Sequence, residues 1–148
     1  MNEAPAVFTL RGGEGERLSF GGVTVLVRVP SDASGGAFSL LEEVPPLMDT
    51  PLHVHRDEDE LFYVLEGEHA FRVGDDEHTV GPGGLVLAPR GVPHAQRRLV
   101  PGHGRELVLV TPGGLEKFLR ELAAAEASGT LGPDAYAVAS ERFGITWL

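Results

Sequence analysis

The chain contains no cysteine among its 148 residues. Disulfide bonds and thiolate ligands are therefore excluded, and any metal must be held by nitrogen and oxygen atoms. Basic residues are also scarce, because 12 Lys and Arg stand against 22 Asp and Glu, for a net charge of −10. An acidic surface repels phosphate backbones and anionic membranes, so we expect no nucleic-acid partner and no membrane partner.

Long apolar runs are missing as well. The segment Met1–Arg17 lacks the apolar stretch of a signal peptide, and no run is long enough to span a bilayer. We therefore expect a cytoplasmic protein. Single domains cluster at about 100–150 residues, so we expect one domain over residues 1–148.

Glycine and proline, in contrast, are frequent, with 20 and 11 copies that separate short apolar runs. Short runs between turn-forming residues are typical of antiparallel strands in an all-β sandwich or barrel. The pattern predicts nine strands, at Val23–Val29, Ala37–Val44, Leu52–His55, Glu60–Leu65, His69–Val73, Glu77–Val80, Leu85–Ala88, Pro93–Leu99 and Leu107–Thr111.

The pattern changes to that of helices after residue 111. Leu115, Phe118, Leu119 and Leu122 recur at helical spacing, with Glu116 among the charged residues assigned to the opposite face. A second helix is predicted over residues 133–142, followed by an extended segment at 145–148. We therefore expect a barrel over about 18–111 and a helical tail over about 112–148.

The candidate metal ligands are His53, His55, Glu60 and His94. Side chains at i and i+2 of a strand share one face, so both imidazoles of His53-Val-His55 converge. The polar run at 56–59 is interpreted as a solvated turn that starts a new strand at Glu60. Three imidazoles and one carboxylate suit Fe, Mn, Ni, Cu, Co or Zn, and leave coordination positions for water or substrate.

The spacing of these residues resembles that of the cupins. His53-x-His55 is followed by Glu60 and Gly67, which matches the first cupin motif. Gly83, Pro89-x-Gly91 and His94 match the second motif. Leu47 replaces the opening Gly of the first motif, and Arg98 replaces the closing Asn of the second. The resemblance implies an antiparallel jelly-roll β-barrel, the four metal ligands and a homodimer. The whole chain is similar, more loosely, to small cupins of the quercetin-2,3-dioxygenase-like group.

Other side chains on the same strands are candidates for the cavity wall. Phe62 shares the parity of Glu60, and Gln96 and Arg98 share that of His94. Tyr63 is a further candidate. Phe62 could equally be a core aromatic residue, and Arg98 is better explained as solvated at the end of its strand. The remaining histidines are interpreted as exposed or partly exposed, at positions 69, 78 and 103.

The resemblance implies a metal-dependent dioxygenase that acts on a hydroxylated aromatic, flavonol-like or enediol substrate. Glu60 would then accept the substrate's proton. Two alternatives stay open, a cupin that binds a metal and a small molecule without catalysis, and a metal-dependent isomerase or lyase. No acid or base outside the ligand set stands out in the sequence, which disfavours the isomerase.

Overall fold

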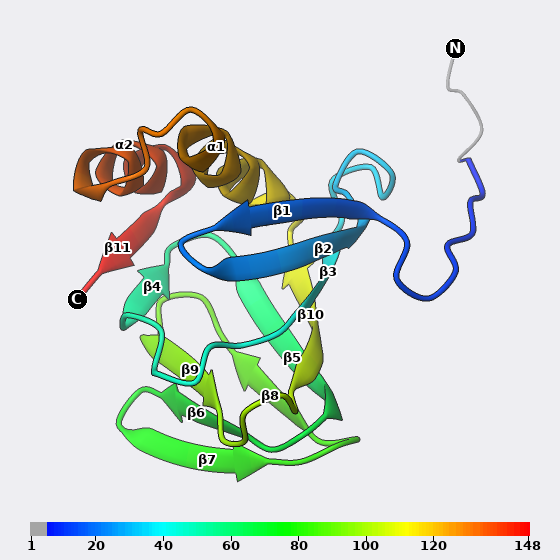
Figure 1. Ribbon diagram of the computed structural model, residues 1–148, viewed down its shortest axis with the longest axis vertical. Helices are drawn as coiled ribbons and strands as arrows, with labels where there is room; N and C mark the ends of the chain where they lie inside the picture. The colour runs from blue at the N-terminus through cyan, green and yellow to red at the C-terminus, as the bar shows by residue number, and fades with distance from the viewer. Residues whose placement is uncertain (1–5) are drawn as a thin grey trace.

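The computed structural model describes residues 6–148, which form two antiparallel sheets under a layer of two helices (Figure 1). The strands are β1 (Glu16–Phe20), β2 (Val23–Val29), β3 (Ser39–Glu43), β4 (His53–His55), β5 (Asp59–Glu66), β6 (His69–Val73), β7 (Asp76–Val80), β8 (Leu85–Ala88), β9 (His94–Arg98), β10 (Arg105–Thr111) and β11 (Ile145–Trp147). The helices are α1 (Leu115–Ala127) and α2 (Pro133–Phe143).

One sheet has the strand order β1-β2-β3-β10-β5-β8, and the other has the order β11-β4-β9-β6-β7. The all-β jelly roll is therefore confirmed, with a difference in its closure: the described strands form two separately hydrogen-bonded sheets and not one closed barrel. All nine predicted strands are present, with ends that differ by a few residues.

The strand β1 is an addition to the prediction. It pairs with β2 across a turn at Gly21-Gly22, where both glycines have positive φ, a conformation that side chains with a Cβ rarely adopt. Only Leu18 and Phe20 of this strand are buried. Two inward residues in five give a weak alternating pattern, so the sequence did not indicate a strand here.

Helix α1 packs on the edge of the larger sheet with the predicted stripe, and Leu115, Phe118, Leu119 and Leu122 are all buried. The assignment of Glu116 to a solvated face is wrong, because its side chain is fully buried. Its carboxylate accepts hydrogen bonds from the backbone N–H of Ser31, the Ser31 hydroxyl and the Ser39 hydroxyl. Glu116 therefore ties the helix to the β2–β3 connection.

The C-terminal elements lie beside the candidate ligands. Helix α2 begins at Pro133 and ends at Phe143, and its cap residue Gly144, with a φ of 68°, turns the chain into β11. This strand pairs with β4, so that Ile145 lies opposite His55 and Trp147 opposite His53. The predicted second helix and extended segment are confirmed. Neither helix of the described residues is long and apolar enough to cross a membrane.

Candidate metal centre

The four predicted ligands come from three strands in two sheets. His53 and His55 lie on β4, and His94 lies on the neighbouring strand β9, where it is paired with His53. Glu60 lies on β5 of the facing sheet. The structure brings one nitrogen or oxygen atom of each residue to within 4.8 Å of all the others. The site thus sits between the sheets.

Hydrogen bonds orient two of the imidazoles. His53 Nδ1 lies 2.8 Å from the Pro51 carbonyl oxygen, and His55 Nδ1 lies 2.8 Å from Glu58 Oε2. Both partners accept, so each Nδ1 carries the proton and each Nε2 presents its lone pair. A carboxylate or carbonyl behind a histidine is the usual support of a metal-binding imidazole.

Glu58 was not predicted, because residues 56–59 were interpreted as a solvated turn. That interpretation is wrong for Glu58, whose side chain is only 11% exposed in its ion pair with His55. A carboxylate three residues after a candidate ligand was the signal in the sequence. The neighbouring Asp59 instead accepts hydrogen bonds from the backbone and guanidinium N–H groups of Arg90. These bonds fix the start of β5.

The charges at the centre fit a cation. Glu60 Oε2 lies 2.7 Å from His94 Nε2 and 3.2 Å from His55 Nε2, yet this buried oxygen has no hydrogen bond of acceptable geometry. Burial alone would raise the pKa of Glu60, but the adjacent imidazoles outweigh it and lower the pKa to about 2. A buried, ionised carboxylate oxygen without a hydrogen bond, facing three imidazoles, is satisfied by a divalent metal.

The histidines differ in their proton affinity. Burial lowers the pKa of His53 to about 4, so this imidazole is neutral and ready to bind. Burial also acts to lower the pKa of His55, but the carboxylates of Glu60 and Glu58 outweigh it and raise that pKa. Of these two imidazoles, His55 is the one at which protons compete more strongly with a metal.

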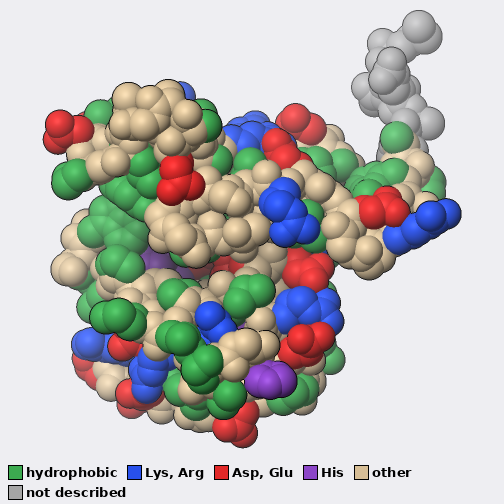
Figure 2. All heavy atoms as spheres, viewed as in Figure 1, with side chains coloured by type: hydrophobic (Ala, Val, Ile, Leu, Met, Phe, Trp, Pro, Cys, Tyr) green, Lys and Arg blue, Asp and Glu red, His purple; other side chains and the backbone are tan. Residues whose placement is uncertain are grey.

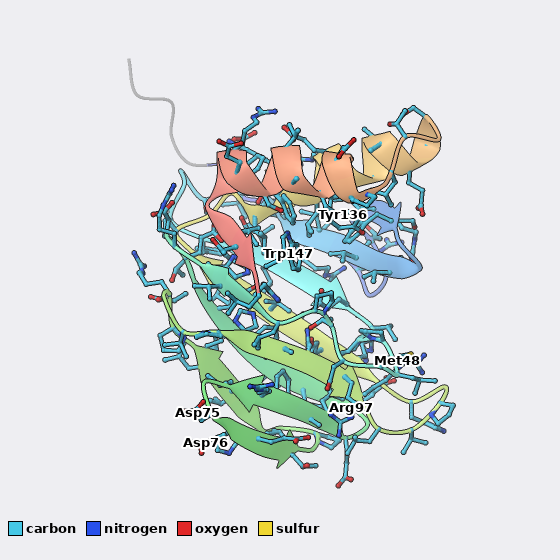
Figure 3. The ribbon with its side chains drawn as sticks, turned by 90° about the vertical axis from the view of Figure 1, so that its left-hand side faces the viewer. Met48, Asp75, Asp76, Arg97, Tyr136 and Trp147 are labelled. Carbon is cyan, nitrogen blue, oxygen red and sulfur yellow. The ribbon has the colours of Figure 1, made fainter. Side chains whose placement is uncertain are left out.

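The centre opens into a cavity of about 800 Å³ that is walled largely by apolar side chains. Figure 2 shows histidine and acidic side chains recessed between the helical layer and the strands. Tyr136 of α2 and Trp147 of β11 lie on the helical side of this cavity, with ring centroids 6.1 Å apart (Figure 3). The helices thus complete a pocket that the two sheets leave open.

Two of the four expected lining residues are in the cavity wall, namely Phe62 and Gln96. Tyr63 is not, and this expectation is corrected: it follows Phe62 directly, so it points to the outer face and is 41% exposed. Arg98 is also outside the wall. Its Nε donates to the Pro45 carbonyl oxygen at 2.7 Å, so it is neither at the cavity nor fully solvated.

Acidic groups outside the ligand set were missed. Glu43 lines the cavity, and Glu106 lies behind it with no exposed surface. His69, expected to be partly exposed, is also fully buried, whereas His103 is exposed as expected. The signal was strand parity: Glu43 alternates in step with the buried Leu41, and Glu106 with the buried Val108.

Comparison with known proteins agrees with this geometry. Residues 40–111 match the family model described as the cupin domain. Over 108 residues the chain is 32% identical to quercetin 2,3-dioxygenase of Bacillus subtilis (strain 168), a match that covers 72% of this chain and 32% of that protein. The chain therefore spans about a third of the length of this curated relative.

Solved structures show the same fold. KdgF from Halomonas sp. aligns with a TM-score of 0.65 at 15% identity, over 76% of this chain and 99% of that one. A sugar phosphate isomerase from the cupin superfamily of Silicibacter pomeroyi DSS-3 aligns with a TM-score of 0.52 at 25% identity, over 61% and 59% of the two chains. Residues 40–111 form a cupin domain, and the resemblance to small cupins of the quercetin-2,3-dioxygenase-like group is confirmed.

Proposed function

We propose that this protein is a metal-dependent dioxygenase acting on a hydroxylated aromatic, flavonol-like compound or on an enediol. The observation that carries the proposal is the convergence of four ligand atoms at one end of a largely apolar cavity. A cavity of about 800 Å³ suits a small molecule of a few rings. The similarity to a quercetin 2,3-dioxygenase supports the substrate class.

His53, His55, Glu60 and His94 would hold one divalent transition metal, among Fe, Mn, Ni, Cu, Co and Zn. A metal bound there would supply Lewis-acid and redox chemistry to the substrate.

The protein's own residues have separate roles around this centre. Glu60 accepts the proton of the substrate hydroxyl on its carboxylate. Glu58 and the Pro51 carbonyl keep two imidazoles in the orientation that binding requires. Phe62, Phe118 and other apolar wall residues exclude water from the reacting groups.

The test combines metal analysis with oxygen uptake. The protein is purified without added metal, analysed for its elements, and then loaded separately with Fe, Mn, Ni and Cu. Oxygen consumption is followed with a panel of flavonols and catechols. We expect uptake with at least one metal, loss of bound metal in His94→Ala, and loss of uptake in Glu60→Gln. Absence of uptake across the whole panel with every metal would refute the dioxygenase.

A metal-dependent isomerase or lyase is a second candidate, favoured by Glu43 in the cavity wall. The sequence had offered no acid or base besides the ligands, and that objection no longer holds. Such an enzyme works without oxygen. Solvent deuterium incorporation into a panel of ketose and aldose phosphates under anaerobic conditions, abolished by Glu43→Gln, would favour this candidate over the dioxygenase.

Homodimer formation also remains a prediction. The outer face of β5 and β8 exposes Tyr63, Leu85 and Leu87, an apolar surface at the edge of the larger sheet. Exposed apolar groups of this kind favour association. Light scattering at several concentrations measures it, and a mass of one chain at all of them would contradict it.

A further inference from the structure

Two carboxyl groups, one half-buried and one fully buried, lie side by side on the inner face of the larger sheet. Glu43 on β3 and Glu106 on β10 are direct cross-strand partners in the antiparallel register. Side chains at such positions have Cβ atoms about 5 Å apart. Glu43 faces the cavity, whereas Glu106 is completely buried behind it. Among the described residues, no Lys or Arg forms an ion pair with either carboxyl.

The hydrogen bonds around the pair, taken with the lowered pKa of His69, favour a proton on Glu106. His69 Nε2 lies 3.0 Å from the Glu66 carbonyl oxygen, which only accepts, so Nε2 carries a proton. His69 Nδ1 lies 2.8 Å from Glu106 Oε2. Burial lowers the pKa of His69 and thus favours the neutral ring. A neutral ring with Nε2–H accepts at Nδ1, so the Glu106 carboxyl is the donor in this contact.

Glu43, Gln96 and Glu106 then form a cluster with more hydrogen-bond acceptors than donors. The Gln96 Nε2 group donates to Glu43 Oε1 at 2.8 Å. The Gln96 and Glu106 Oε1 atoms are both buried without a hydrogen-bond partner. A proton on Glu43 supplies a donor that this group lacks.

Electrostatics supports the same protonation. Burial, with Glu106 as the nearest like charge, raises the pKa of Glu43 well above its usual range. Burial raises the pKa of Glu106 to about 7. Glu60 on β5 adds a third negative charge facing the pair. Arg98 is a positively charged neighbour of His69, and it lowers the pKa of that imidazole.

Glu43 is joined through Gln96 to the strand that carries the ligand His94. Gln96, which holds Glu43, follows His94 by two residues on the same face of β9, about 7 Å along the strand. That is roughly the length of one aromatic ring with its oxygen substituent. A ligand of that length, bound at the metal centre and lying along β9, reaches the level of Gln96 and of the Glu43 carboxyl that it holds.

We infer that Glu43 is a second acid–base residue of this cavity, that it donates a proton to an oxygen of the bound substrate remote from the metal, and that Glu106 is its positioning residue. This inference rests on the proposed function. The O–H bond of Glu43 breaks with its electron pair left on the carboxylate, and a new O–H bond forms on the product oxyanion. The carboxylate keeps the Gln96 hydrogen bond. It recovers a proton from water, while Glu60 returns to water the proton taken from the substrate hydroxyl.

The first test detects the protonated carboxyl group directly and needs no catalytic turnover. Infrared difference spectra at neutral pH compare the metal-loaded wild type with Glu43→Gln, Glu106→Gln and the control Glu42→Gln. Glu42 is adjacent on β3 but pairs with Arg105 and Arg28 on the opposite face. We expect the C=O band of a protonated carboxyl group in the wild type and the control, weakened in each of the other two. Equal bands in all four proteins would overturn the inference.

The second test uses quercetin as the probe. Anaerobic addition should shift the protonated-carboxyl band of the wild type but not that of Glu43→Gln; an unshifted band with quercetin bound would overturn the inference. If quercetin is oxidised, Glu43→Gln should lower kcat by about 100-fold or more with little change in KM, as expected for loss of a general acid. An unchanged kcat would overturn the inference. Glu43→Asp should restore part of kcat. Glu106→Gln should shift the alkaline limb of the pH profile of kcat.

Failure of the proposed function gives a different result. If quercetin is bound but no oxygen is consumed with any metal, the dioxygenase is refuted, and a shifted band still supports Glu43 as a donor. If quercetin does not bind, the variant spectra decide alone. Loss of the band in Glu43→Gln then supports the inference, and its persistence overturns it.

Discussion

Replacement of Glu106 by Gln should stabilise the metal-free protein at neutral and alkaline pH. The Glu106 side chain is fully buried, and its Oε2 atom contacts Nδ1 of His69, an imidazole whose lowered pKa favours the neutral ring. A glutamine of the same shape carries no charge. Its amide N–H can donate to His69 Nδ1 as the protonated carboxyl does, so the variant leaves no new unsatisfied group there.

The magnitude follows from the pKa of Glu106, which burial raises from 4.5 to about 7. Because the folded pKa is raised, the folded state binds more protons than the unfolded state between these values. Wild-type stability therefore falls as pH rises through that window and is constant above it. At 1.36 kcal/mol for each pKa unit, the full effect is about 3 kcal/mol. Glu106→Gln does not lose stability across this window. Its free energy of unfolding therefore exceeds that of the wild type by almost nothing at the acidic end and by the full amount at the alkaline end.

Urea unfolding of the metal-free wild type and Glu106→Gln, in a series from about pH 5 to about pH 8, measures the difference at each pH. Glu42→Gln is the control for removal of an acidic charge from the opposite face of the neighbouring strand, where Glu42 is ion-paired with Arg28 and Arg105. The advantage of Glu106→Gln should grow steadily across the series. A difference that does not vary with pH, or a variant that is less stable at alkaline pH, would refute the assignment of a protonated Glu106.

Three further predictions concern the metal centre and the helix anchor. Glu58→Ala should weaken metal binding by about 10–100-fold in titration calorimetry, because it removes the carboxylate behind His55; unchanged affinity would show that Glu58 does not orient the ring. Metal affinity should fall as pH falls through the raised pKa of His55, with about one proton released per metal, while His53 and Glu60 stay unprotonated until far lower pH. Calorimetry in buffers of different ionisation enthalpy counts that proton, and a count of zero would contradict the pKa order. Glu116→Ala should lower the free energy of unfolding by about 3 kcal/mol, because it strands the buried donors that its carboxylate satisfies.

The ligand set was predictable because its signals are local. His53-Val-His55 places two imidazoles on one strand face by parity alone, and the downstream Pro89-x-Gly91 turn precedes His94. The pairing of His53 with His94 and the facing position of Glu60 depend on the order of the strands in two sheets. The cupin motif supplied that order by resemblance, whereas spacing alone did not.

The acidic residues that were missed or misassigned share a physical cause. Glu106 and Glu116 are fully buried and Glu43 is half-buried, whereas an acidic residue in a sequence is read as solvent-facing unless its partners are known. The partners lie far along the chain: Ser31 for Glu116, and His69 for Glu106. Parity marked Glu43 and Glu106 as inward-facing, but only the register of β3 with β10 shows that they meet.

The buried acids also change how the cavity is understood chemically. A cupin centre with Glu60 as its sole acid–base group can take up a substrate proton only next to the metal. With Glu43 in the wall, the same cavity has an ionised carboxylate at the metal centre and the inferred protonated carboxyl beside Gln96. Two acidic residues in one pocket with pKa values displaced in opposite directions are the arrangement expected where one group accepts a proton and the other donates one. The environments that separate them are structural: imidazoles surround Glu60, whereas Glu43 has a second carboxyl and an amide.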